Sequence, residues 1–340
     1  MRQLLVLAAL FFSFPVQAAV AIDYFAPMVP EDYGGSFSDL MTPVGNAGNA
    51  PDTPSTNCFA ADCGSVAYDY WMSKYETTNA AYVEFLNAKA ASDPLGLYNT
   101  SMGSDATFGG ITRSGVSGGY TYTAKLGFES KPVVYVSFYD ALRFSNWLDN
   151  GEGIGDTETG AYTLLGGTAI PSNGPTVTRN GGANVFLTSE NEWYKAAYYD
   201  ALSATYLDYP TGTDSVTGCV APGADTGNSA NCDLAVGALT DAGAYGLSDS
   251  PYGTYDQGGN VWEWNEEIVS VSSRGFRGGS WGNGVGILAA SIASEFDPSY
   301  EGSGVGFRVA SLVPEPGTSL LAMTSFACLA ALRRRTARNR

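Results

Sequence analysis

The chain has 340 residues, enough for one large domain, with 17 basic and 34 acidic residues and no histidine. Residues 19–316 hold 11 of the basic and all 34 acidic residues, a net charge of −23, which argues against nucleic acid as a partner. Without histidine, the chain has no Ser-His-Asp hydrolysis, Cys-His nucleophile, histidine zinc site or two-His-one-carboxylate iron site.

The first 18 residues have the pattern of a secretion signal. Arg2 precedes an apolar run at 4–14, and a small-x-small site for signal peptidase ends at Ala18. We expect cleavage there and an exported mature chain. Residues 19–65 are rich in Gly, Pro, Ser and Asn and are expected to form an irregular lead-in to a domain at 66–311.

The first two helices of this domain are each predicted to follow a strand. An aromatic strand at 67–75 leads to a helix capped by Thr77 or Thr78. A second strand at 132–136 leads to a helix whose N-cap is Ser137 and whose first turn contains an aspartate. Both helices have an aromatic face, which is expected to lie in the core.

A third helix begins with the capping box of Ser189 and Glu192. Most of the remaining chain is Gly-, Asn- and Tyr-rich, at 151–184, 200–252 and 278–304. Loops of this length are uncommon in a compact domain unless they are functional or tied down.

Four cysteines remain in the mature chain, because Cys328 lies in the C-terminal tail. In an oxidising compartment, their short separations favour two local disulfides, Cys58–Cys63 and Cys219–Cys232. Ligation of a metal through sulfur is the alternative.

Five segments occur in order along the chain. They are Tyr75-Glu76-Thr77-Thr78-Asn79, Pro132–Ser137, Leu187–Trp193, Gly258–Trp264 and Arg277–Trp281, the last closed by Gly306-Phe307-Arg308. Together they resemble the formylglycine-generating (sulfatase-modifying factor) domain family. The resemblance implies an α+β fold, the formylglycine-generating-enzyme-type variant of the C-type lectin fold, with few helices, a short twisted antiparallel sheet and long irregular loops.

The resemblance also implies structural calcium, which in that family is carried by the Gly-Asn-Val-Trp-Glu-Trp turn. The implied ligands are Glu263, Gly258, Gly259 and Val261 for one ion, and Asn231, Cys232 and Asp233 for a second. Calcium accepts six to eight oxygens, including carbonyls of irregular loops. The alternative is a metal-free turn with the glutamate in an internal hydrogen bond.

The chain departs from the family where its chemistry is done. Active members oxidise a substrate cysteine with a copper-binding thiol pair between the Arg-Gly-Gly-Ser-Trp and Gly-Phe-Arg segments. Here residues 282–305 contain no cysteine, and relatives that use non-haem iron need histidines. We therefore expect neither copper nor iron and assign no catalytic residue. Arg277, Arg308 and Ser280 are interpreted as structural.

The leading hypothesis is a non-catalytic module that presents a loop surface to a glycan or a surface protein. Variable proteins diversified by retroelements use the same fold for ligand display. The candidate binding surface comprises Trp281, Asn283, Glu295, Asp297, Tyr300 and Glu301. The alternative is an enzyme of the superfamily with a rearranged centre built from the three carboxylates of that set.

Residues 312–340 resemble a PEP-CTERM sorting tail, which in that family is recognised and removed by an exosortase. The motif is Val313, Pro314, Glu315 and Pro316, followed by an apolar segment at 317–332 and a basic end at 333–340. An ordinary C-terminal anchor is the alternative. The predicted processing partners are signal peptidase and an exosortase. The predicted location is the cell surface or extracellular matrix of a Gram-negative bacterium, after transient anchoring in the membrane.

Overall fold

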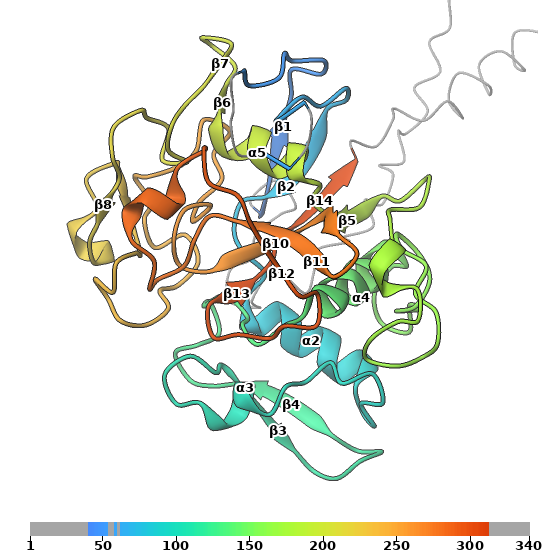
Figure 1. Cartoon of the computed structure of the whole chain (residues 1–340). Coiled ribbons are helices and arrows are strands. Elements are labelled where there is room, and N and C mark those ends of the chain that lie inside the picture. The colour runs from blue at the N-terminus through green and yellow to red at the C-terminus, as the bar shows by residue number, and fades with distance from the viewer. Residues whose placement is uncertain (1–39, 54–57, 60–61, 313–340) are drawn as a thin grey trace, which may run out of the picture.

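The computed structural model describes residues 40–53, 58–59 and 62–312 (Figure 1). The predicted secretion signal and the predicted sorting motif with its apolar segment lie outside these residues. Within them, no helix is both long enough and apolar enough to cross a bilayer.

One four-stranded antiparallel sheet joins the two ends of the domain. Its strands are β1 (Met41–Val44), β2 (Tyr70–Ser73), β14 (Val309–Leu312) and β5 (Val185–Leu187), in that order. Strand β1 lies inside the 19–65 segment that was expected to be irregular, so that expectation is wrong for these four residues. Met41 and Val44 are buried in the core, and this burial fixes the strand against β2 despite its turn-rich surroundings.

A second four-stranded sheet has the order β12-β11-β10-β13. Its strands are β10 (Trp262–Ser270), β11 (Ser273–Arg277), β12 (Ser294–Phe296) and β13 (Val305–Gly306). Strand β13 pairs parallel to β10, and the other pairs are antiparallel. Three two-stranded sheets complete the set: β3 (Ile111–Ser114) with β4 (Thr121–Ala124), β6 (Tyr199–Asp200) with β7 (Thr205–Tyr206), and β8 (Gly218–Cys219) with β9 (Ser229–Ala230).

The helices are few; the three longer ones start where the sequence predicts them, and the short helix at Ser101–Ser104 was not predicted. They are α2 (Asn79–Lys89), α3 (Ser101–Ser104), α4 (Phe138–Asp149) and α5 (Glu190–Tyr198), with 3-10 turns at Gly174–Thr176, Pro222–Ala224 and Val285–Leu288. Thr78 caps α2, Ser137 caps α4 and Ser189 caps α5. Both α4 and α5 begin with a complete capping box, which satisfies the free N–H groups of their first turns.

The predicted strand at 132–136 does not form. Only Pro132 makes a bridge, to Thr78, and Tyr135 has a φ of +63°. A bulky residue in the left-handed region breaks an extended path, so the segment turns instead of pairing. Its valines are nevertheless buried, as expected of the motif.

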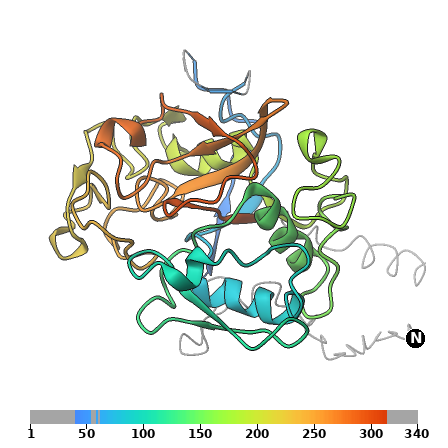
Figure 2. The same ribbon diagram turned by 60° about the horizontal axis from the view of Figure 1, so that its bottom comes forward.

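Helices α2 and α4 pack against each other through aromatic rings, and Figure 2 shows the course of the two helices from below. The ring of Phe144 lies 5.4 Å from Phe85, 6.0 Å from Tyr82 and 5.3 Å from Phe307, measured between centroids. These edge-on and stacked contacts tie the two helices to the chain end that leads into β14. The long loops at 200–260 lie on the other side of the molecule (Figure 1).

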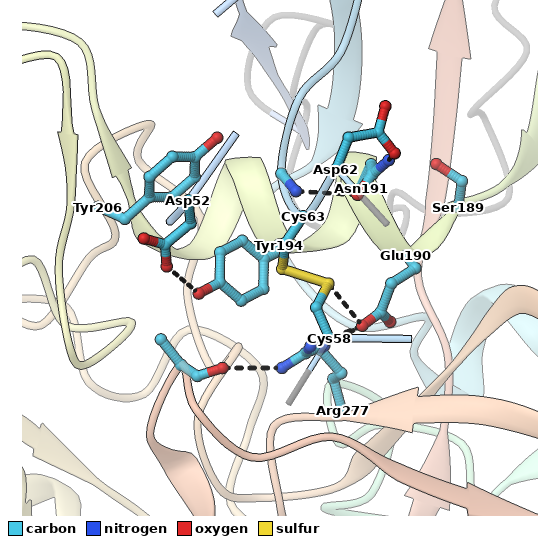
Figure 3. The surroundings of a disulfide bond; sticks show 12 residues. Asp52, Cys58, Asp62, Cys63, Ser189, Glu190, Asn191, Tyr194, Tyr206 and Arg277 are labelled. Atoms are coloured by element: carbon cyan, nitrogen blue, oxygen red, sulfur yellow. Dashed lines mark hydrogen bonds and ion pairs between the residues drawn. A yellow bond between two sulfur atoms is a disulfide. The ribbon is translucent and has the colours of Figure 1, made fainter. Parts of the chain in front are cut away.

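Both predicted disulfides are confirmed. The Cys58–Cys63 bond lies over the first turn of α5, where Cys58 Sγ is 3.5 Å from Glu190 Oε1 (Figure 3). The Cys219–Cys232 bond clips the β8–β9 loop, with Cys232 fully buried. These four cysteine sulfurs are therefore used in disulfides, and the alternative of metal ligation through sulfur does not apply to them.

Candidate functional site

The carboxylate of Glu263, the predicted calcium ligand, is held in an internal ion pair. Arg308 donates from Nε to Oε2 and from Nη2 to Oε1, both at 2.6 Å, and Trp193 Nε1 donates to Oε2 at 2.7 Å. Glu263 and Arg308 are both fully buried. This arrangement matches the metal-free alternative and does not fit a calcium ion bound through the Glu263 side chain.

The second implied calcium site is only partly suited to an ion. Asn231 Oδ1 is buried and has no hydrogen-bond partner, which is the kind of oxygen a cation takes. However, its backbone carbonyl accepts from Asn260 N at 2.8 Å, and Asp233 is exposed. No group of three or more His, Cys, Asp or Glu side chains in the described chain is arranged to hold a metal ion. Calcium at this position stays a prediction.

Other charged side chains in and around the motif segments are also held in internal ion pairs. Arg277 pairs with Glu190 at 2.6 Å, and both side chains are buried. Arg179 bridges Glu192 and Glu266, at 2.7 Å to each. In this part of the core, each of these carboxylates therefore faces a guanidinium.

The residues of the predicted binding surface lie in different local surroundings. Trp281 stacks on Phe108 with ring centroids 4.4 Å apart, in a small cluster with Tyr135. Asn283 accepts from the hydroxyl of Ser280 at 2.8 Å, so both are used locally, as expected for a structural serine.

The remaining residues of the predicted surface lie on β12 or directly after it. Glu295 is exposed on β12 and accepts from Ser273 Oγ at 2.9 Å, and Asp297 is exposed and accepts from Ser299 Oγ at 2.6 Å. Tyr300 packs on Phe296 with ring centroids 4.3 Å apart. Only the last residue, Glu301, enters a cavity.

That cavity, called the pocket below, has a volume of about 410 Å³. It is lined by residues of four separate segments: Gly96, Ser137, Tyr139, Asp140, Ala169, Ile170, Ser299 and Glu301. Its volume lies within the roughly 300–1,000 Å³ typical of small-molecule sites. The wall combines hydroxyl groups and two carboxyl groups with the apolar side chains of Ala169 and Ile170, which suits a ligand with both polar and apolar faces.

Asp140 and Glu301, the acid pair, are hydrogen-bonded to each other in the pocket. Asp140 is 3% exposed, and its Oδ2 accepts from the N–H and the hydroxyl of Ser137 at 2.9 and 2.6 Å. Glu301 Oε2 accepts from Asn99 Nδ2 at 2.5 Å. These contacts fix both carboxyl groups from the protein side.

The acid pair holds its protons unusually tightly. Burial raises the pKa of Asp140 to about 6, although the hydrogen bonds from Ser137 lower it. Burial, and then the charge of Asp140, raise the pKa of Glu301 to about 7. Two carboxyls in contact in a poorly solvated place cannot both ionise easily, so the pair retains a proton near neutral pH.

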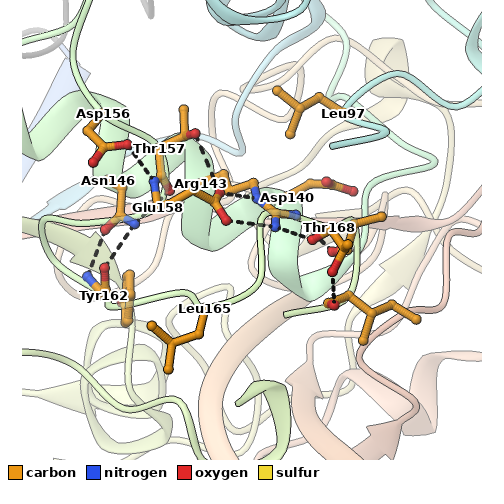
Figure 4. Close-up of polar contacts among 12 residues, drawn as sticks. Leu97, Asp140, Arg143, Asn146, Asp156, Thr157, Glu158, Tyr162, Leu165 and Thr168 are labelled. Carbon is orange, nitrogen blue, oxygen red and sulfur yellow. Dashed lines mark hydrogen bonds and ion pairs between the residues drawn. The ribbon is translucent and has the colours of Figure 1, made fainter. Parts of the chain in front are cut away.

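Arg143 lies near the acid pair and holds one of the segments that line the pocket. It lies one turn after Asp140 on α4 and is fully buried. Its Nε donates to Glu158 Oε1 at 2.6 Å, and its other nitrogens donate to the carbonyls of Thr168 and Ala169 at 2.7 and 2.8 Å (Figure 4). The guanidinium therefore positions the loop that closes the pocket, and its ion-pair partner is Glu158, not the acid pair.

The acid pair was not predicted as a unit. Glu301 was proposed for a surface, and Asp140 was interpreted only as a favourable charge in the first turn of a helix. One feature of the sequence bore on it: the position three residues after the N-cap belongs to a capping box, whose carboxylate packs inward. Nothing local indicates that residue 301 returns to that helix end.

Fold and site together define an α+β protein of the formylglycine-generating type of C-type lectin fold, with a polar pocket beside α4. The family model for the sulfatase-modifying factor enzyme 1-like domain matches residues 39–313. The chain belongs to this family.

Solved structures with a similar fold include CarF, at 20% identity over 80% of this chain and 98% of that chain, with a TM-score of 0.54. Variable protein 1 of Treponema denticola matches at 19% over 80% and 95%, with a TM-score of 0.49. PvdO of Pseudomonas aeruginosa matches at 15% over 80% and 94%, with a TM-score of 0.45. No curated protein matches. At such identities the structural similarity concerns the fold alone.

Proposed function

We propose that this protein is an exported, non-catalytic recognition module that binds a small polar ligand, a glycan, in the pocket. The observation that carries the proposal is the pocket itself. Residues 282–305, which lack the thiol pair of active family members, contribute Ser299 and Glu301 to its wall. The segment associated with chemistry in the family is here part of a binding cavity.

The lining of the pocket supports a glycan. The hydroxyls of Ser137 and Ser299 already donate to Asp140 and Asp297, so they offer lone pairs to a ligand. Tyr139 adds a hydroxyl that can donate or accept, and the acid pair accepts hydrogen bonds. A sugar presents the same mixture of donors and acceptors. The flanking Ala169 and Ile170 are exposed and supply the apolar contact that a sugar ring face needs.

A superfamily enzyme with a rearranged centre is the second candidate, and the acid pair is the observation that favours it. However, Glu295 and Asp297 lie outside the pocket, so the three predicted carboxylates do not converge. In addition, Asp140 and Glu301 are in direct hydrogen-bond contact. Glycoside hydrolysis uses carboxyls about 5–10 Å apart, so the pair is too close for that reaction.

The binding proposal is tested on the secreted protein with a glycan array followed by calorimetry. We expect micromolar binding of at least one matrix glycan by the wild type. The Ala169→Trp variant fills the pocket mouth from an exposed position and should lose this binding while its melting temperature is unchanged. Equal binding by both proteins, or binding by neither, would remove the pocket as the site.

The export proposal has its own readout. Mass spectrometry of the protein from the producing cell should show a chain that begins at Ala19 and has lost the tail after the 313–316 motif. Alanine substitution of Pro314 and Glu315 should leave the tail attached. A full-length chain in the wild type would contradict export and processing.

A further inference from the structure

The pocket has two acidic groups in its wall and no basic one. The basic side chains near the segments that line the pocket make contacts with other groups. Arg143 holds Glu158 and two carbonyls, Arg113 lies 3.7 Å from Asp93 and over two tyrosine rings, and Lys89 donates to two loop carbonyls. No basic side chain lines the pocket itself; the charge of Arg143 lowers the pKa of Asp140, but the ion-pair partner of this guanidinium is Glu158.

Both members of the acid pair line the cavity, and Asp140 is 3% exposed. The Oδ2 atom of Asp140 accepts two hydrogen bonds from Ser137, and its carboxyl also contacts that of Glu301. A ligand in the pocket therefore lies beside both carboxyl groups.

We propose that the pocket selects a ligand with a positive charge, a small hydroxylated molecule with an aliphatic ammonium group, which replaces the shared proton between Asp140 and Glu301. This inference rests on the proposed binding pocket and names the chemical class of its ligand. The proton leaves to solvent as the ammonium group donates to both carboxylates. No covalent bond forms or breaks.

The proposal predicts that affinity rises with pH from 5 to 8. The groups that face the pair are the Asp93 carboxyl, the Arg143 guanidinium, the Asn99 amide and the Ser137 hydroxyl. Tyr82 and Tyr139 lie near the same charges, and burial raises the pKa of both, so they stay neutral in this range. The titration between pH 5 and 8 is therefore that of the acid pair, since an aliphatic amine stays protonated throughout.

The test is calorimetry of the secreted protein with methyl 6-amino-6-deoxyglucoside, its 6-acetamido derivative and cadaverine, at pH 5 and 8. At pH 8 we expect the amine to bind at least tenfold tighter than the acetamide, with little proton release because both carboxyls are already ionised, whereas at pH 5 binding of the amine should release protons, seen in buffers of different ionisation enthalpy. At pH 5 the affinity for the amine should fall about tenfold. Glu301→Gln should abolish both effects, whereas Glu84→Gln, an exposed glutamate on α2 outside the pocket, should change neither.

The outcomes separate this inference from the proposed function. Equal affinity for amine and acetamide overturns the cationic ligand but leaves a glycan pocket. Binding of cadaverine without either sugar supports the cationic ligand and overturns the glycan. Binding of none of the three overturns both.

Discussion

The core behind β10 and the pocket beside α4 both bury carboxylates, but they compensate for the charge differently. In the core, Arg308 faces Glu263 and Arg277 faces Glu190, each at 2.6 Å. In the pocket, Asp140 and Glu301 face each other. A buried carboxylate that is paired with a guanidinium is a structural part of the core, called the frame below, because each charge already has its partner. A buried pair without a cation keeps a proton, and a ligand that supplies the cation can take its place.

Removal of Arg308 should give the largest effect. Arg308→Met leaves Glu263 buried without its partner and releases three carbonyls, of Ser73, Lys74 and Tyr255. We expect the free energy of unfolding in urea to fall by about 3–5 kcal/mol. The double variant with Glu263→Gln should recover part of this loss. A loss below about 1 kcal/mol for the single variant would show that the pair is not part of the frame.

The disulfides should also contribute to the frame but not to the pocket. Replacing Cys219 and Cys232 with serine opens a loop of 13 residues and should lower the free energy of unfolding by about 3 kcal/mol. The same change at Cys58 and Cys63, 5 residues apart, should lower it by about 2 kcal/mol. Neither change should alter ligand affinity. A loss of ligand affinity in a variant that still folds would contradict the separation of the frame from the pocket.

In the pocket, removal of a carboxylate should stabilise the protein. The pKa of Glu301, raised to about 7, lies above its unfolded value, so ionised Glu301 destabilises the fold above that pH and has little effect near pH 5. Glu301→Gln should therefore raise the free energy of unfolding by about 1 kcal/mol at pH 8 and leave it nearly unchanged at pH 5. Glu84→Gln, on the exposed face of α2, is the matched control and should have no effect at either pH. Destabilisation by Glu301→Gln at pH 8 would mean that its charge is compensated after all.

Chelation of divalent metals should give the smallest effect. Both oxygens of Glu263 already accept hydrogen bonds, so saturating EDTA can act only at the predicted Asn231 site, and we expect it to lower the melting temperature by no more than about 1 °C. A fall of several degrees would contradict this. In that case Asn231, whose Oδ1 is buried without a partner, is the first residue to replace by alanine.

Local sequence patterns predicted much of this fold. The caps at Thr78, Ser137 and Ser189 and both disulfides follow from residues a few positions apart, and all are confirmed. The motif segments indicated the family for the same reason. Each is a short turn or strand that requires particular side chains at neighbouring positions. Strand β1 was missed because four residues in a turn-rich stretch carry too little periodicity, and only pairing with β2 makes them a strand.

The pocket could not be predicted in this way. Asp140 and Glu301 are distant in sequence, and they meet because the chain returns to the start of α4 after β12. The position of Arg143 is equally dependent on tertiary structure, since its partners come from the 156–170 loop. Whether a buried carboxylate has a guanidinium partner depends on such long-range contacts. This pairing is what distinguishes the carboxylates of the frame from those of the pocket.

The ionisation of Asp140 and Glu301 tests the account most directly. Carboxyl ¹³C shifts of the two side chains can be followed by NMR from pH 3 to 9, with the Glu301→Gln variant used for assignment. We predict apparent pKa values of about 6 and about 7 for the pair, and a lower value for Asp140 in the variant. Titration of both groups near pH 4, as for exposed carboxyls, would contradict an acid pair that awaits a cation.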